Sequence, residues 1–540
     1  MIERETLERD QPSPPEERTA IFMAPIQLPH MQRRLITIGV MTGMFLGALE
    51  GTVVGTAMPT VVARLGGIDI YSWVFSIYLL TSTVTMPLWG KLSDLYGRRR
   101  FYLLGVGLFL FGSVLSGQSN SMHELIGFRA IQGLGAGALV PLGLTMIGDI
   151  YSLTERARMQ GLFSGVWGMA SMVGPLVGGL ITDHISWRWV FYLNVPFGLA
   201  AVVIIGLTRK EPRTERQVHI DARGVITFAT AITLFLLALM EGGRSYGWTS
   251  PTILSLFAAS IFSFWLFLSL ERNAPEPIIP LSLFRENRLF RATAINGLLA
   301  GMAMFGSISF IPLFVQGVIG TSATRAGSVL IPLTIGWTSW SVVSSRLLLR
   351  VGYRPLVIAG MCSLTIAFLM LIRLSPTSSW LLIYSNMFLV GMGMGLSMVT
   401  LLIAVQNSVQ RQQMGIATSA TQFFRIIGGA IGVAIMGTVM TLRMKVHVVD
   451  PTISPNGNTT EIARLLQHPD ALIDPMTRGR LSPEVLTVLQ GVLADALHGV
   501  FWVGLIVAVL ALGSAFLVPK GRPHEHAVQR EPILPLGERN

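Results

Sequence analysis

The chain has 540 residues, of which 51% are hydrophobic and only 13% are charged, and this balance excludes an ordinary soluble protein with a polar surface. The formal net charge of +11 does not indicate a nucleic-acid partner, because the arginines lie in short segments between apolar runs rather than on one contiguous face. The single cysteine, Cys362, excludes an intrachain disulfide framework. We therefore predict an all-α protein that crosses the lipid bilayer many times.

Apolar runs of roughly 20 residues predict fourteen membrane-spanning helices. They cover residues 35–58, 71–90, 101–118, 123–150, 157–182, 189–208, 221–241, 251–270, 290–318, 326–348, 355–373, 379–405, 414–441 and 493–518. Residues 1–34 and 519–540 are polar tails, and the first of them lacks the apolar core of a signal peptide. Most Lys and Arg residues lie in loops on the side of the amino terminus, so the positive-inside rule places both termini in the cytoplasm.

Glycine patterns recur after roughly 250 residues and predict two related halves. The spacing of Gly161, Gly174 and Gly178 is repeated by Gly415, Gly428 and Gly432. The spacing of Gly133, Gly135 and Gly137 is repeated by Gly391, Gly393 and Gly395. The loops 90–100 and 345–355 also correspond, with Gly97 matching Gly352 and Arg99 matching Arg354. We predict six-helix bundles at 35–208 and 290–518, two inserted helices with their linkers at 209–289, and an external loop at 442–492 that either covers the protein or binds a partner.

The stretch GLFSGVWGMASMVGPLVGG at 161–179 indicates a helix that packs closely on a neighbour. Gly165, Gly174, Gly178 and Gly179 remove side-chain bulk, so that another backbone can approach. Pro175 removes one backbone hydrogen bond and predicts a bend. This helix is either part of a gate or a simple packing surface.

The loop GKLSDLYGRRR predicts a latch on the cytoplasmic side. Gly90 allows close helix contact, Asp94 can accept hydrogen bonds from a helix end, and Gly97 permits a tight turn. Arg98 and Arg99 then supply cations for ion pairs that form in one state and break in another. The alternative is an ordinary positively charged loop.

Three of the charged residues that fall within predicted spans are candidates for a function, because an ionised side chain there is costly unless it has a function or a partner. Glu50 is the favoured proton carrier, because burial disfavours its charged form and it could exchange a proton between the two sides. Arg129 could pair with such an acid or extend to the outer surface, and Arg425 is a second candidate for coupling. A static, hydrogen-bonded Glu50 is the alternative. Asp149, at the end of a span, is interpreted as a cap or a loop ion pair.

Polar and aromatic residues within the spans are candidates for the lining of a central cavity, although a helix side that touches lipid explains any one of them equally well. They are Gln132, Trp167, Gln316, Gln406 and Phe423. The chain has no Walker loop, no metal-ligand cluster and no nucleophile motif, so we expect no enzyme, no metal and no cofactor, and an ion gradient as the energy source.

The motifs together resemble the major facilitator superfamily over about residues 35–518. GKLSDLYGRRR, FRAIQGLGAG and GMASMVGPLVGG are similar to its signatures in loop 2–3, helix 4 and helix 5, and LEGTVVGTAMP and WRWVFYLNVPFG resemble its fourteen-helix drug:proton antiporter branch. The chain departs from the branch at Glu50, where an Asp is usual, and Leu349 replaces the acid of the second loop, so the latch is expected to be asymmetric.

The resemblance implies two bundles that rock about a central cavity, and proton influx that drives export of lipophilic, often cationic compounds across a bacterial inner membrane. Its partners would be the substrate, protons and lipid, and a monomer is assumed. The alternatives are an exporter of an endogenous lipid or secondary metabolite, and a transporter-like receptor or scaffold that binds a ligand without moving it.

Overall fold

The computed structural model describes residues 28–66, 70, 73–208, 221–243, 246–274, 277–321, 323–448 and 483–521. Within these ranges the protein is helical and contains no β-sheet beyond one isolated bridge between Gly242 and Tyr246. The predicted all-α class is therefore confirmed. Most of both predicted tails, and the middle of the loop predicted at 442–492, lie outside the described residues.

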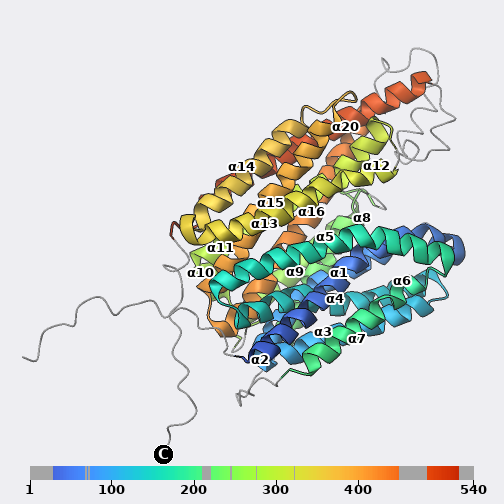
Figure 1. The fold of residues 1–540 in the computed structure, drawn as a ribbon. Coiled ribbons are helices and arrows are strands. Elements are labelled where there is room, and N and C mark those ends of the chain that lie inside the picture. Colours follow the sequence, from blue (N-terminus) through green and yellow to red (C-terminus); the bar gives the residue numbers. More distant parts are fainter. Residues whose placement is uncertain are drawn as a thin grey trace, which may run out of the picture.

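The helices form two lobes, shown in Figure 1. The first lobe contains α1 (His30–Leu65), α2 (Trp73–Tyr96), α3 (Arg98–Gln118), α4 (Met122–Ile150), α5 (Leu153–His184), α6 (Trp189–Tyr192) and α7 (Asn194–Gly206). The second contains α10 (Leu281–Arg285), α11 (Arg288–Leu313) with the π-helix η2 (Phe314–Val318), α12 (Ala323–Ser328), α13 (Leu330–Val351), α14 (Tyr353–Leu371), α15 (Trp380–Ser408), the 3-10 helix η3 (Arg411–Gln413), α16 (Met414–Val448) and α20 (Pro483–Ala515).

Two further helices, α8 (Ala222–Glu241) and α9 (Pro251–Glu271), lie between the lobes in the sequence and pack on one another. A buried apolar cluster joins them to α2 of the first lobe and α16 of the second, and includes Leu80, Phe228, Phe267 and Ile427. This pair therefore covers the junction of the two lobes rather than belonging to either one.

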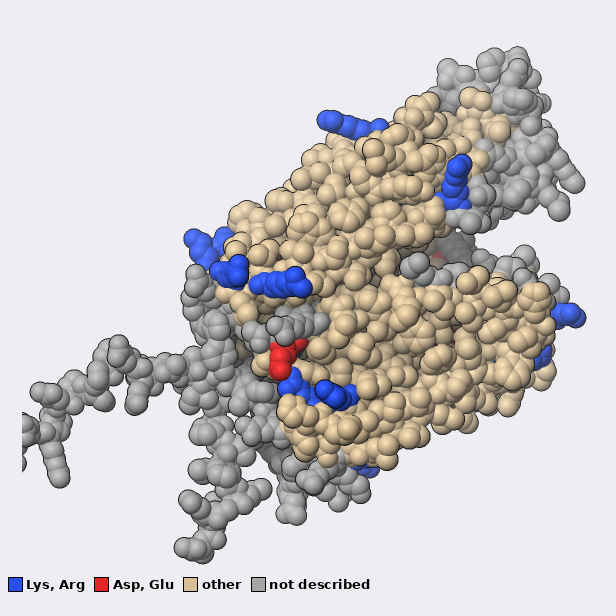
Figure 2. Space-filling view, viewed as in Figure 1, with Lys and Arg blue, Asp and Glu red and all other residues tan. Residues whose placement is uncertain are grey.

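Twelve helices of the described chain are long and apolar enough to cross a membrane. The predicted spans at 71–90 and 157–182 are not among the twelve, although both form long helices, α2 with 24 residues and α5 with 32. Several Ser and Thr residues reduce the hydropathy of α2. Figure 2 agrees with a membrane protein, because on the face shown the Lys and Arg side chains lie toward the ends of the lobes and the surface between them carries none.

Glycines set the close approach of helices, and they do so in the same way in both lobes. In the first lobe, Gly178 of α5 faces α1, where an added Cβ would lie 2.9 Å from the Val53 carbonyl oxygen. In the second lobe, Gly432 of α16 faces α11, where a Cβ would lie 2.6 Å from Met302 Cα. The predicted repeat is thus visible in the packing, since α5 rests on α1 as α16 rests on α11.

The turns that start the third helix of each lobe are also equivalent. Gly97, before α3, has φ 102°, and Gly352, before α14, has φ 82°. Both angles lie in the left-handed region that glycine adopts without strain. These two glycines let the chain reverse directly from α2 into α3 and from α13 into α14.

Candidate functional site

A buried ion pair joins α1 and α4 inside the first lobe. The Glu50 residue is 1% exposed and Arg129 is 2% exposed, and Arg129 Nη1 donates to Glu50 Oε1. Arg129 Nε also donates to the Val74 carbonyl oxygen of α2 at 3.1 Å, and Nη1 donates to Gln132 Oε1 at 2.9 Å. The guanidinium lies 4.2 Å from the centre of the Tyr78 ring. The structure therefore places Arg129 in the bundle interior and not at the outer surface.

Asn194, the first residue of α7, completes the surroundings of Glu50. Its Nδ2 donates to Glu50 Oε2 at 2.5 Å and to Ser113 Oγ at 2.9 Å, and Ser113 Oγ donates to the Phe191 carbonyl oxygen at 2.8 Å. Asn194 and Ser113 are fully buried. Asn194 is not among the residues predicted from the sequence. The available signal was a single amide side chain in the otherwise apolar stretch after WRWVFYL.

The Glu50 carboxylate and the Arg129 guanidinium form the centre of this buried network. Each oxygen of the Glu50 carboxylate accepts from a different partner, so either oxygen would lose a donor contact if it took a proton. A buried ion pair is sensitive to the loss of one charge, because the remaining charge is then uncompensated. Among the described residues no cluster of three or more His, Cys, Asp or Glu side chains could hold a metal ion.

A second set of charges joins the two lobes at the end where α2 turns into α3, which we call the latch face. Asp94, near the end of α2, accepts from the backbone N–H groups of Gly415 at 2.9 Å and Ile416 at 2.8 Å, and from Arg98 Nη1. Gly415 and Ile416 form the first turn of α16 in the other lobe. A carboxylate at this position compensates the positive end of the helix dipole.

Arg98 extends this contact to further groups. Its Nε donates to Asp149 Oδ2 at 3.0 Å, and its Nη2 donates to the Arg411 carbonyl oxygen at 2.9 Å. Arg411 Nε in turn lies 3.3 Å from Asp149 Oδ1. The side chains of Asp94 and Asp149 are 1% and 4% exposed, so these contacts are largely shielded from solvent. Asp149 thus forms the ion pair that was one of its two predicted roles.

Gly90 and Arg99, also selected from this loop, have different surroundings. A Cβ on Gly90 would lie 2.7 Å from the Gly415 carbonyl oxygen, so the absence of a side chain permits α2 and α16 to touch. Arg99 Nε donates to the Ile205 carbonyl oxygen at 3.0 Å, and Nη2 donates to the Gly206 carbonyl oxygen at 2.5 Å. Arg99 therefore caps α7 within its own lobe.

Other hydrogen bonds join the lobes in the half of the molecule nearest the latch face. Arg156 Nη1 of α5 donates to Asn407 Oδ1 of α15 at 3.2 Å, and Thr338 Oγ1 of α13 donates to the Ser164 carbonyl oxygen of α5 at 3.3 Å. At the opposite end, Figure 2 shows the surface hollowed between the two lobes. The lobes are thus in contact at the latch face and separated at the far end.

The five residues selected for a cavity lie in different surroundings. Gln132 is fully buried beside Arg129, and its Nε2 has no hydrogen-bond partner within the described chain. Gln406 Nε2 donates to a carbonyl oxygen of α4 at 3.4 Å, which places it between the lobes near the latch face. The ring of Phe423 packs against a phenylalanine of α8, with centroids 5.6 Å apart. Trp167 on α5 is 42% exposed, and Gln316 lies in η2.

Arg425 of α16 lies near Trp337 of α13 in the second lobe. Its Nε is buried and has no hydrogen-bond partner among the described residues, and its guanidinium lies 5.8 Å from the centre of the Trp337 ring. Arg425 is therefore a buried cation whose Nε donor is unsatisfied within the described chain.

The glycines selected on α5 fall into two groups. Gly174 and Gly178 contact α1, where Thr52 Oγ1 also donates to the Ala170 carbonyl oxygen of α5 at 3.3 Å. An added Cβ on Gly165 or Gly179 would meet no atom within 4 Å. The helix runs without interruption through position 175, and the side chain of Pro175 lies outside the described residues.

Comparisons with known proteins identify the family of this fold and site. The family description Major Facilitator Superfamily matches residues 40–433. Multidrug transporter protein MdtP of Bacillus subtilis is 38% identical over 509 residues, which cover 90% of this chain and 93% of that protein. Multidrug resistance protein 3 of the same organism is 36% identical, covering 91% and 96%. The crystal structure of the human organic anion transporter MFSD10 (TETRAN) has a TM-score of 0.58 at 14% identity, covers 89% of this chain and 100% of that one, and shares its fold.

Proposed function

Because the chain belongs to the Major Facilitator Superfamily, and is thus a multi-pass membrane transporter and not an enzyme, we propose that it is a multidrug efflux protein that exchanges protons for its substrate. Its substrates would be lipophilic, often cationic compounds exported across the cytoplasmic membrane. Two relatives named as multidrug proteins support efflux of several compounds. The buried network of Glu50, Arg129 and Asn194 is the single observation that carries the proton coupling.

In this proposal Glu50 carries the proton. When the hollow between the lobes opens outward, a proton from outside neutralises the Glu50 carboxylate and weakens its pairing with Arg129 and Asn194. After the lobes rock, the proton leaves to the cytoplasm and the ion pair forms again. A cationic substrate favours the charged carboxylate and therefore competes with the proton, which is the condition for exchange. Arg425 would be a second coupling charge, in the other lobe.

The latch face is the cytoplasmic side in this proposal, following the positive-inside rule. Counting α2 and α5 with the twelve apolar helices gives fourteen spans and returns both termini to that side. Ion pairs around Asp94 and Arg98 then hold the outward-open state and must break for the lobes to open inward. The glycine surfaces of α5 and α16 would let these helices tilt against α1 and α11.

The proposed organisation keeps the boundaries of the sequence analysis. Bundles at 35–208 and 290–518 enclose the substrate cavity, and the segment 209–289 supplies two inserted helices. The cavity would be reached by Gln132, Trp167, Gln316, Gln406 and Phe423 as the lobes move. We expect a monomer, because the cavity lies within one chain.

Efflux of ethidium from proteoliposomes under an imposed pH gradient tests this function. The native protein should show gradient-dependent efflux. Glu50→Gln should lose it, because a glutamine amide does not take up and release a proton as a carboxylate does. Glu124→Gln is the matched control, since Glu124 is an exposed acid in the first turn of α4, the helix that carries Arg129. Absence of efflux from folded native protein would refute the proposed substrate class.

A further inference from the structure

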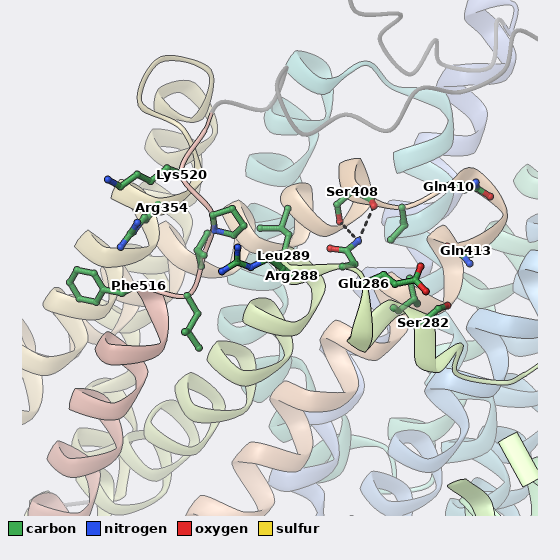
Figure 3. Close-up of a pocket in the computed structure, with 16 residues that line it drawn as sticks. Ser282, Glu286, Arg288, Leu289, Arg354, Ser408, Gln410, Gln413, Phe516 and Lys520 are labelled. Carbon is green, nitrogen blue, oxygen red and sulfur yellow. Dashed lines mark hydrogen bonds between the residues drawn. The ribbon is translucent and has the colours of Figure 1, made fainter. Parts of the chain in front are cut away.

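Two clefts open at the latch face of the second lobe. The larger, of about 870 Å³, lies among α10, the start of α11, the segment before α16 and the end of α20 (Figure 3). The smaller, of about 660 Å³, lies at the start of α14 and is lined by Val351, Arg354, Pro355, Ile358, Ala359, Lys520 and Gly521. Arg354 and Lys520 line both clefts, so the two clefts adjoin at these side chains, and we call them together the groove.

The groove is basic at one end. Arg288, Arg354 and Lys520 line the larger cleft, against one carboxylate, Glu286. Figure 3 shows Arg354 and Lys520 beside one another at one end, with Glu286 toward the other. Neither Arg288 nor Arg354 has a hydrogen bond or ion pair to another described residue, and Arg354 makes only a ring contact, 5.5 Å from the centre of Phe516.

The internal repeat makes the position of Arg354 informative. Its counterpart in the first lobe, Arg99, donates to two carbonyl oxygens at the end of α7, and so uses its guanidinium within the protein. In the second lobe, the corresponding helix end is that of α20. Phe516 and Leu517, which follow this helix, are each 54% exposed and accept no hydrogen bond from Arg354. The second arginine is therefore available to an acceptor from outside the protein.

Apolar surface continues from the basic end toward the membrane. The smaller cleft has apolar walls from Val351, Pro355, Ile358 and Ala359, and Val351 is 45% exposed. α14 is one of the helices apolar enough to cross a membrane, and these residues precede it or form its first turns. A ligand in the groove would thus meet cations at the membrane border and apolar side chains beside the hydrocarbon.

We propose that this groove binds an anionic phospholipid. Arg288, Arg354 and Lys520 contact the phosphate and headgroup, since guanidinium and ammonium groups bind phosphate oxygens in charge-assisted hydrogen bonds. An acyl chain lies along Val351 and Ile358. Basic pockets between helix ends on the cytoplasmic side of a membrane are suited to such headgroups. The proposal is independent of proton coupling, because the groove contains no residue of the Glu50 network.

Lipid titration of the full-length purified protein in detergent, followed by native mass spectrometry, tests this site. Dioleoylphosphatidylglycerol should bind more tightly than dioleoylphosphatidylcholine, and the double variant Arg354→Gln/Lys520→Gln should weaken the first roughly thirtyfold, given the contribution of each basic side chain near an anionic headgroup. The double variant Arg346→Gln/Arg350→Gln is the matched control. It removes two exposed cations of α13 that line neither cleft, and should bind as the native protein does.

Four results would overturn the proposal. One is equal binding of the two lipids, and another is native affinity for phosphatidylglycerol in Arg354→Gln/Lys520→Gln, provided that its thermal midpoint without lipid matches the native one. If glycerol phosphate competes as well as the lipid does, the occupant is a soluble anion. Binding that appears only after residues 522–540 are removed would identify the chain's own carboxyl-terminal segment as the occupant.

Discussion

Replacing Asp94 with Asn should weaken the contact that closes the latch face. In the closed state the two Asp94 oxygens accept from the Gly415 and Ile416 N–H groups at 2.9 and 2.8 Å, and also face Arg98. Asn offers one acceptor oxygen and turns an NH₂ donor toward the other N–H. Loss of one charge-assisted hydrogen bond costs about 2 kcal/mol, which lowers the ratio of closed to open latch about thirtyfold.

Spin labels at positions 100 and 350, both exposed at the latch face and in different lobes, measure this change by pulsed EPR in a background with Cys362→Ser. Asp94→Asn should add a population at longer distance that is absent from the native protein. Glu155→Gln is the control, because the ion pair of Glu155 with Arg33 joins α5 and α1 within one lobe. Unchanged distances in Asp94→Asn would show that Asp94 does not hold the lobes together.

Three further changes test the packing and the buried polar groups. Gly428→Ala would place a Cβ 2.9 Å from a Cα of α11 and should destabilise the protein by about 1–3 kcal/mol, which lowers the thermal midpoint by about 1–3 °C for a chain of this length. Gly165→Ala adds its Cβ in open space and should leave the midpoint unchanged, so equal midpoints for the two variants would contradict the packing argument. Asn194→Ala removes a hydrogen-bond donor to the Glu50 carboxylate and should slow gradient-driven ethidium efflux roughly tenfold. Efflux at the native rate would show that Asn194 has no role in the mechanism. Arg425→Gln breaks no hydrogen bond among the described residues, so the thermal midpoint of this variant should equal the native one while its ethidium efflux falls. Efflux at the native rate would exclude a role of Arg425 in proton coupling.

The sequence predicted the features that depend on local composition and on the repeat. Apolar runs determine helices in lipid, because the bilayer leaves no other partner for backbone groups. Paired glycine patterns then indicated which surfaces pack, and Gly178 and Gly432 make equivalent contacts. Glu50 and Arg129 were selected separately because each is an isolated charge in a span, and the structure shows that they are partners.

The sequence could not supply contacts that depend on the relative rotation of distant helices. Asn194 was missed because one amide at the start of a span usually serves as a local cap, and its contact with Glu50 arises only when α7 packs beside α1. Arg99 was expected in the latch, yet one residue after Arg98 the helix has turned by about 100° and the side chain meets α7 instead. Arg411 was likewise not selected from the sequence, although its carbonyl oxygen and side chain both contact the charges at the latch face.

The central claim, that Glu50 couples substrate movement to protons, is tested most directly by measuring proton flux driven by substrate alone. Proteoliposomes with an imposed ethidium gradient and no initial pH gradient, loaded with the pH indicator pyranine, should show proton movement opposite to ethidium for the native protein. Glu50→Gln should show none while it still exchanges ethidium for ethidium, which demonstrates that it remains folded and able to alternate. Proton movement at the native rate in Glu50→Gln would contradict the account.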